Sequence, residues 1–114
     1  MYKLSCTYKD RPADPFSVKM VDGRCRVFLA CALQTASETS IENTEIKLYS
    51  GSSADATKLR ATVSSTIDTQ GERASIAITN FPPEGILFED GVFVVMGRYT
   101  LGMSLFHNGG VSSS

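Results

Sequence analysis

The chemistry that this sequence could perform depends first on its single histidine, His107, which stands two residues before Gly109. A serine or cysteine nucleophile normally needs a general base beside it, and histidine is the commonest one. No nucleophile elbow of the Gly-x-Ser-x-Gly type occurs in the sequence. A lone histidine beside a glycine turn is typical of a solvated or capping residue, so we expect no catalytic residue here.

Metal binding or disulfide formation would have to involve three cysteines, Cys6, Cys25 and Cys31, which show no Cys-x-x-Cys spacing. Their odd number argues against a secreted disulfide framework and for synthesis in a reducing compartment. If Cys25 and Cys31 share one strand, they lie roughly 20 Å apart, against the ~5.5 Å between Cα atoms that a disulfide needs. A bridge from Cys6 to either stays open, but small buried apolar residues are the better interpretation.

Carboxylates could serve glycoside cleavage or calcium binding, and five of them stand near one another in two groups. Turn formation is the better explanation of each group, because acidic residues favour positions next to glycine in tight turns. No phosphate-binding or dinucleotide-binding glycine motif occurs. We therefore predict no metal, no cofactor and no enzymatic activity, and an enzyme that uses these acids is the least favoured alternative. The five are Glu84, Glu89, Asp90, Asp68 and Glu72.

Composition agrees with a protein that acts by association. The 114 residues carry a net charge of -1, and Lys and Arg are scattered rather than gathered in a block, so we expect no nucleic-acid or membrane partner. The longest apolar run, Val27 to Leu33, is far too short to span a membrane, and no export signal is recognisable. We expect one soluble domain over residues 1–110, followed by a flexible polar tail, 111–114.

The elements that must position these residues are strands, because an alternation of apolar and polar residues with period two dominates the chain. In the first strand, Tyr2, Leu4, Cys6 and Tyr8 lie on one face and the polar residues on the other. The stretch from Cys25 to Leu33 is apolar on both faces, so it should lie centrally in its sheet or against a partner subunit. The other expected strands are 45–50, 59–67, 74–78, 86–89, 92–96 and 100–107, and the long loop before Cys25 has room for one further short strand at 16–21.

Short polar stretches separate these strands and indicate tight turns. Asp22-Gly23 should end the strand at 16–21, and Gly71 should lie in the loop of a hairpin between 59–67 and 74–78. Asp90-Gly91 is the dipeptide best suited to a two-residue hairpin turn and predicts a hairpin between the runs at 86–89 and 92–96. The predicted fold is all-β: a β-sandwich or jelly-roll-like barrel of about seven to eight short antiparallel strands.

The aromatic residues have strand spacing and include no Trp, so most should pack in the core. An exposed subset would mark a protein interface, and Phe28, Phe93 and Tyr49 are our candidates. Together with the Ser/Thr-rich loops at 35–44 and 51–57, they also support an alternative function, a carbohydrate- or receptor-binding module.

Two segments resemble a family of small β-rich proteins encoded among the virion genes of tailed bacteriophages. The first runs from Ile46 to Ala54 with Leu59 following, and the second from Pro83 to Val94. Members of that family share a strand, a Gly/Ser-rich loop and a second strand, and later a Gly-Ile-x-Phe-x-x-Gly-Val type of hairpin. The match covers about half of the chain and leaves the first third unmatched.

The resemblance implies a non-enzymatic virion structural protein, namely a capsid decoration or cement protein, or a head or tail accessory protein. Such a protein would be made in the cytoplasm of the bacterial host and would end in the virion. Its partners would be copies of itself, in symmetric oligomers such as trimers, and the major capsid protein or other virion proteins. No catalytic residues come with the resemblance.

Overall fold

The computed structural model describes residues 4–12, 16–35, 42–67, 74–96 and 100–113, and ten strands lie within these ranges. No α-helix occurs in the described residues, and the one helical element is a short 3-10 helix, η1 (Ala56–Lys58). The strands are β1 (Ser5–Asp10), β2 (Ser17–Asp22), β3 (Cys25–Thr35), β4 (Glu42–Ser50), β5 (Leu59–Ile67), β6 (Ala74–Asn80), β7 (Ile86–Phe88), β8 (Val92–Val95), β9 (Thr100–Asn108) and β10 (Val111–Ser112).

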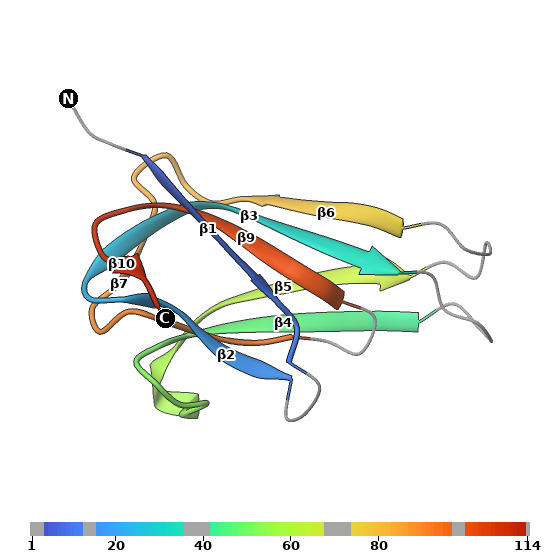
Figure 1. Cartoon of the computed structure of the whole chain (residues 1–114), viewed down its shortest axis with the longest axis horizontal. Coiled ribbons are helices and arrows are strands. Elements are labelled where there is room, and N and C mark those ends of the chain that lie inside the picture. The colour runs from blue at the N-terminus through green and yellow to red at the C-terminus, as the bar shows by residue number, and fades with distance from the viewer. Residues whose placement is uncertain (1–3, 13–15, 36–41, 68–73, 97–99, 114) are drawn as a thin grey trace.

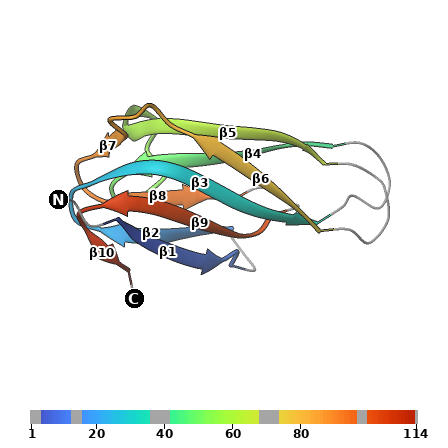
Figure 2. The same ribbon diagram turned by 90° about the horizontal axis from the view of Figure 1, so that it is seen from above.

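The strands form two antiparallel sheets of five strands each (Figures 1 and 2). Sheet 1 has the order β1-β9-β3-β6, with β7 also paired to β3, and sheet 2 has the order β10-β2-β8-β4-β5. The prediction of an all-β, antiparallel chain is confirmed. The described strands form no closed barrel, because each sheet keeps two edges.

The strand that is apolar on both faces, β3, lies in the interior of sheet 1, between β9 on one side and β6 and β7 on the other. This confirms its central position. A register shift between Val27 and Leu29 marks a β-bulge at Phe28, and it exchanges the two faces of the strand. Before the bulge Val27 is buried, and after it the buried residues are Ala30 and Ala32 rather than the predicted alternation through Leu29.

The predicted hairpin between 59–67 and 74–78 is wrong. β5 pairs with β4 in sheet 2, whereas β6 pairs with β3 in sheet 1, so the connection crosses from one sheet to the other. Gly71 lies outside the described residues. Alternation predicts that both segments are strands, but it carries no information about which neighbour each strand pairs with.

The predicted hairpin at Asp90-Gly91 is also wrong, although the turn is present and Gly91 adopts a φ of +92°. β7 belongs to sheet 1 and β8 to sheet 2, so the turn is an arch between sheets. The reason is burial. A two-residue hairpin would pair Phe88 with Phe93 and place Phe88 on the face opposite Val92 and Val94. The arch lets Phe88, Val92 and Val94 all point inward, and each is fully buried.

Two further connections cross between the sheets in the same way. Asp22-Gly23 joins β2 to β3, and Gly109-Gly110 joins β9 to β10. Residues 111–113, expected to form a flexible tail, instead belong to the fold: β10 pairs with β2, and the Ser113 amide donates to the carbonyl of Met20 at 2.9 Å.

The buried apolar residues of both sheets belong to one core cluster. Sheet 1 contributes residues of β3, β7 and β9, including Phe88, Met103 and Leu105, and sheet 2 contributes residues of β2, β4, β5 and β8. The described residues include no helix with the length and apolar character that a membrane-spanning helix needs.

Candidate association surface

His107 is 1 % exposed, so of its two expected roles, solvated or capping, the solvated one is wrong. Its Nδ1 lies 2.9 Å from the carbonyl oxygen of Gly109 and therefore donates to it, which caps the turn. Its Nε2 lies 2.9 Å from Oγ1 of Thr7, and that hydroxyl lies 2.6 Å from Oγ of Ser112. In the neutral imidazole, Nε2 accepts from Thr7, and Thr7 accepts from Ser112.

This chain of hydrogen bonds contains a hydroxyl beside a histidine, which is the arrangement that nucleophilic catalysis uses. Thr7, however, is 2 % exposed, so no substrate reaches its hydroxyl in this conformation. These hydrogen bonds connect β1, β9 and β10, and they therefore hold the C-terminal strand of sheet 2 against sheet 1. Lys9 strengthens the same connection, because its ammonium group donates to the carbonyl of Ser113.

The two segments that carry the resemblance meet in space around Lys19 on β2. Its Nζ donates to the carbonyl oxygen of Gly51 at 2.6 Å, to Oγ of Ser52 at 2.9 Å and to the carbonyl oxygen of Asp90 at 2.9 Å. The amide of Gly51 donates to the carbonyl of Gly91 at 3.2 Å. Gly91 cannot be replaced without strain, because a Cβ there would collide with the backbone carbonyl of Val21.

The predicted acidic residues do not converge on a site. Asp90 lies beside Lys58 at 3.9 Å, with both side chains largely exposed, and Glu84 and Glu89 are exposed. Asp68 and Glu72 lie outside the described residues. Over the described ranges, no group of three or more His, Cys, Asp or Glu side chains is close enough to hold a metal ion.

The three cysteines are free thiols in three different environments. Cys25 is buried in the core, and burial raises its pKa to about 11 against the opposing effect of the Lys19 ammonium group. Cys31 is half-buried and Cys6 is exposed, so the expectation that all three are buried is wrong.

β1 presents its faces in the opposite sense to the one its sequence predicts. The polar residue Thr7 points inward, whereas Leu4, Cys6 and Tyr8 are exposed, Leu4 by 58 % and Tyr8 by 47 %. The inward position suits Thr7 because His107 is its partner there. The apolar side of the strand therefore lies on the outside of the molecule.

These residues continue into a surface that we call the outer face of sheet 1. Residues paired across an antiparallel ladder share a face, and the pairing defines three complete outward rows across β1, β9, β3 and β6. The first two rows contain no charged residue, and Ile78 is 61 % exposed. These two rows are Cys6–Phe106–Leu29–Asn80 and Tyr8–Ser104–Cys31–Ile78.

The third row is Asp10–Gly102–Leu33–Ile76 and contains one charged residue, Asp10. Tyr8 lies over Gly102, where a Cβ would overlap its phenol group, and the hydroxyl of Tyr8 donates to the Asp10 carboxylate at 2.8 Å. This hydrogen bond to Asp10 is the main reason why the pKa of Tyr8 is raised. The one acidic residue at this edge is therefore bound to an aromatic residue of the same face.

The aromatic residues predicted as an interface lie elsewhere. Tyr49 and Phe93 pair with each other on the outer side of sheet 2, where Phe93 is half-buried and Tyr49 is only 7 % exposed. Phe28 sits at the bulge of β3, and its ring packs on Gly85. The outer face of sheet 1 was missed because its residues belong to strands far apart in the sequence.

No protein-family model matches this chain, and neither a curated protein nor a solved structure does.

Proposed function

We propose that the two sheets form a β-sandwich and that the molecule is a structural module that acts by association rather than by catalysis. The shared core supports the sandwich, because buried side chains of both sheets contribute to one cluster. The outer face of sheet 1 carries the functional part of the proposal. Contiguous exposed apolar surface on a folded domain is typical of a site for protein association.

More particularly, we propose a virion structural protein of a tailed bacteriophage, either a capsid decoration or cement protein or a head accessory protein. Its partners are copies of itself and a protein of the particle. The resemblance of residues 46–54 and 83–94 supports this assignment, and both segments meet at Lys19 and are held there by hydrogen bonds. The loop of one segment and the turn of the other therefore act as one structural unit.

The test is mass spectrometry of particles purified by density gradient from cells that express the gene. The expected result is this chain at a copy number comparable to that of a capsid component. Its absence from intact particles, with the protein present in the cell lysate, would overturn the assignment. A second sample, in which Ile78 is replaced by Glu, tests the surface, and we expect the variant chain to be depleted from particles while it still folds.

A further inference from the structure

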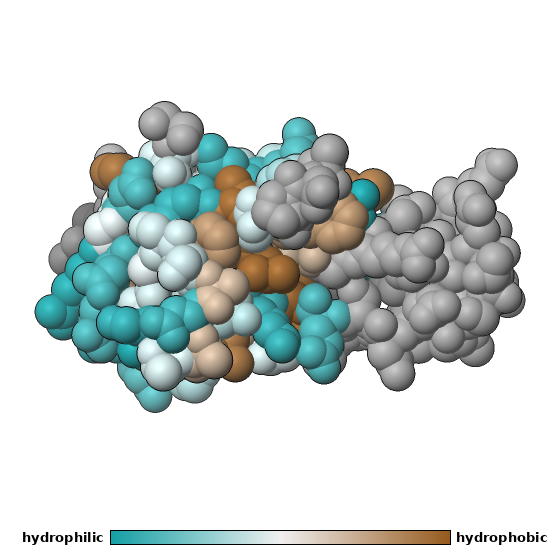
Figure 3. All heavy atoms as spheres, turned by 90° about the horizontal axis from the view of Figure 1, so that it is seen from below, coloured by the Kyte–Doolittle hydropathy of each residue, from teal (hydrophilic) through white to brown (hydrophobic). Residues whose placement is uncertain are grey.

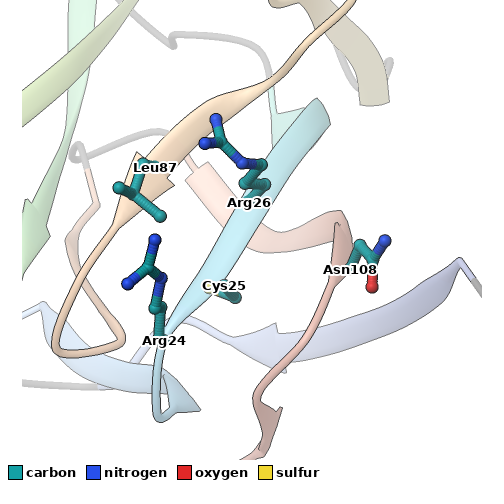
Figure 4. A pocket seen from close by; sticks show the side chains of 5 residues that line it. All are labelled: Arg24, Cys25, Arg26, Leu87 and Asn108. Carbon is teal, nitrogen blue, oxygen red and sulfur yellow. The ribbon is translucent and has the colours of Figure 1, made fainter. Parts of the chain in front are cut away.

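A pocket of about 250 Å³ lies at the end of sheet 1 where β3 begins, and its lining includes two arginines (Figure 4). Arg26 pairs with Leu87 of β7 on one side and with Asn108 of β9 on the other, so these three side chains share a face. Arg24 stands two residues earlier on the chain. Figure 4 shows both guanidinium groups on the Leu87 side of β3.

Neither arginine is neutralised by the surrounding part of the molecule. Both are exposed, and in the described residues the one ion pair is Lys58 with Asp90, on sheet 2. The polar contact of Arg26 is one long hydrogen bond of 3.5 Å to the backbone carbonyl of Glu84. Arg24 lies just before β3 and Arg26 is its second residue, so two like charges line one pocket and favour an anion there.

The position of the pocket relates it to the outer face of sheet 1. Cys25 and Val27 point into the core ahead of the bulge, so Arg24 and Arg26 point outward. Beyond the bulge the outward positions are Leu29, Cys31 and Leu33 of the same strand. The apolar face is thus continuous, along β3, with a cationic pocket at one end.

We infer that this pocket binds a carboxylate of an acidic segment on the protein that docks against the outer face of sheet 1. Guanidinium groups match carboxylates in geometry and charge, and Leu87 offers an apolar contact to a residue beside the acid. A nucleic acid fits less well, since a phosphate backbone needs an extended basic track and this chain has a net charge of -1. The identity of the partner rests on the proposed function, whereas the chemistry of the pocket does not.

The test is an NMR titration of the folded, ¹⁵N-labelled chain with an N-acetylated pentapeptide of alternating Glu and Leu, and separately with inorganic phosphate. We expect saturable shifts of the amides of Arg26, Leu87 and Asn108 and of the arginine Nε resonances with the peptide. The affinity should fall by about tenfold when Arg24 and Arg26 are both replaced by Gln, because charge-assisted hydrogen bonds are lost. Arg60→Gln, on β5 of the other sheet, is the matched control and should bind as the wild type does.

Unchanged peptide affinity in the double variant would overturn the inference. So would equal affinity for phosphate and peptide at these arginines, which would indicate an unspecific anion site. Replacement of both arginines by Lys should restore part of the affinity but less than all of it, since Lys cannot form the bidentate pair. If the chain is present in particles but binds no peptide in solution, the proposal for the pocket is wrong and the virion assignment stands. If the chain binds the peptide but is absent from particles, the proposal for the pocket stands and the virion assignment is wrong.

Discussion

The outer faces of the two sheets differ in the way they use charge. Sheet 2 has two complete outward rows across four strands, and each of these rows contains a lysine. The rows are Lys19–Phe93–Tyr49–Leu59 and Ser17–Val95–Lys47–Thr62. Viewed from below, the side on which β2 and β4 lie, hydrophobic residues form a narrow band bordered by hydrophilic ones (Figure 3). Two of the three outward rows of sheet 1 contain no charge, and the third contains Asp10, whose carboxylate accepts a hydrogen bond from Tyr8.

The outward rows of sheet 2 are mixed, because each places a lysine beside apolar side chains. Two outward rows of sheet 1 consist of apolar side chains, thiols and uncharged polar groups, and the charged residues Asp10, Arg24 and Arg26 lie toward the ends of that face. The core already has its cover, so the apolar character of this second face has no role in burying the interior. This difference supports the proposal that the outer face of sheet 1 is the one that associates with a protein.

The bulge in β3 turns Leu29, Cys31 and Leu33 toward the outer face of sheet 1. The reactivity of the cysteine thiols tests this placement, and it is the largest effect that we expect. Cys25 lies before the bulge and points inward, and Cys31 lies after it and points outward. Burial raises the pKa of Cys25 from 9.0 to about 11. Because the thiolate is the reactive form, the folded protein should modify Cys25 about a hundredfold more slowly than the protein in denaturant. Mass spectrometry of a time course with a maleimide measures the rates.

The same pKa change makes stability depend on pH. The unfolded thiol ionises near pH 9.0 and the folded one near 11, so the contribution of Cys25 is fully present below pH 9 and is lost as the pH rises through about 11. Cys25→Ala should remove this part of the alkaline slope in urea unfolding, and Cys31→Ala should leave it unchanged. Rapid labelling of Cys25 before Cys6 and Cys31 would show that the bulge is misplaced.

The lysines of sheet 2 provide the next largest effect, because one of them supports structure and the other does not. Lys19 donates to three acceptors in the loop and the turn, whereas Lys47 of the neighbouring row makes no hydrogen bond or ion pair with the described residues. Lys19→Met should lower the free energy of unfolding by about 2 kcal/mol, since hydrogen bonds from a charged donor are lost and the carbonyls stay unpaired. Lys47→Met should change it by less than about 0.5 kcal/mol. Equal effects in chemical denaturation would contradict the role of Lys19.

The sequence predicts the strands far better than it predicts their partners. Alternation locates β3 and β9 to within two residues at either end, because local periodicity reflects the burial of one face. The Asp90-Gly91 dipeptide likewise predicts a turn, since a positive φ is a local requirement. Whether that turn makes a hairpin or an arch depends on where Phe88, Val92 and Val94 find a common interior, which is a property of the whole fold.

The candidate surface was still harder to predict, for two physical reasons. In β3, the residues on both sides of the bulge are apolar on both faces of the strand. The sequence pattern therefore does not show which set of alternate residues points into the core, or that a bulge exchanges the two sets. In β1 the apolar residues were expected inside, but the inward position is held by Thr7, whose partners His107 and Ser112 lie 100 and 105 residues away in the chain. No local pattern signals a contact of that range.

The smallest expected effect, and the most direct comparison of the two faces, comes from placing a glutamate on each. Ile78 and Thr62 are both exposed residues on edge strands, β6 of sheet 1 and β5 of sheet 2. Since both side chains contact solvent, either substitution should change the free energy of unfolding by less than about 0.5 kcal/mol. Ile78→Glu should nevertheless weaken association by about tenfold, because a charge must then be desolvated in an apolar interface.

Light scattering and sedimentation over a range of protein concentrations measure this association. Thr62→Glu should assemble as the wild type does. If the wild-type chain stays monomeric at every concentration, its partner is another protein of the particle and not a second copy. The depletion of Ile78→Glu from particles is then the deciding measurement. If Thr62→Glu weakened assembly and Ile78→Glu did not, the association surface would lie on sheet 2, and the absence of charge from two outward rows of sheet 1 would need another cause.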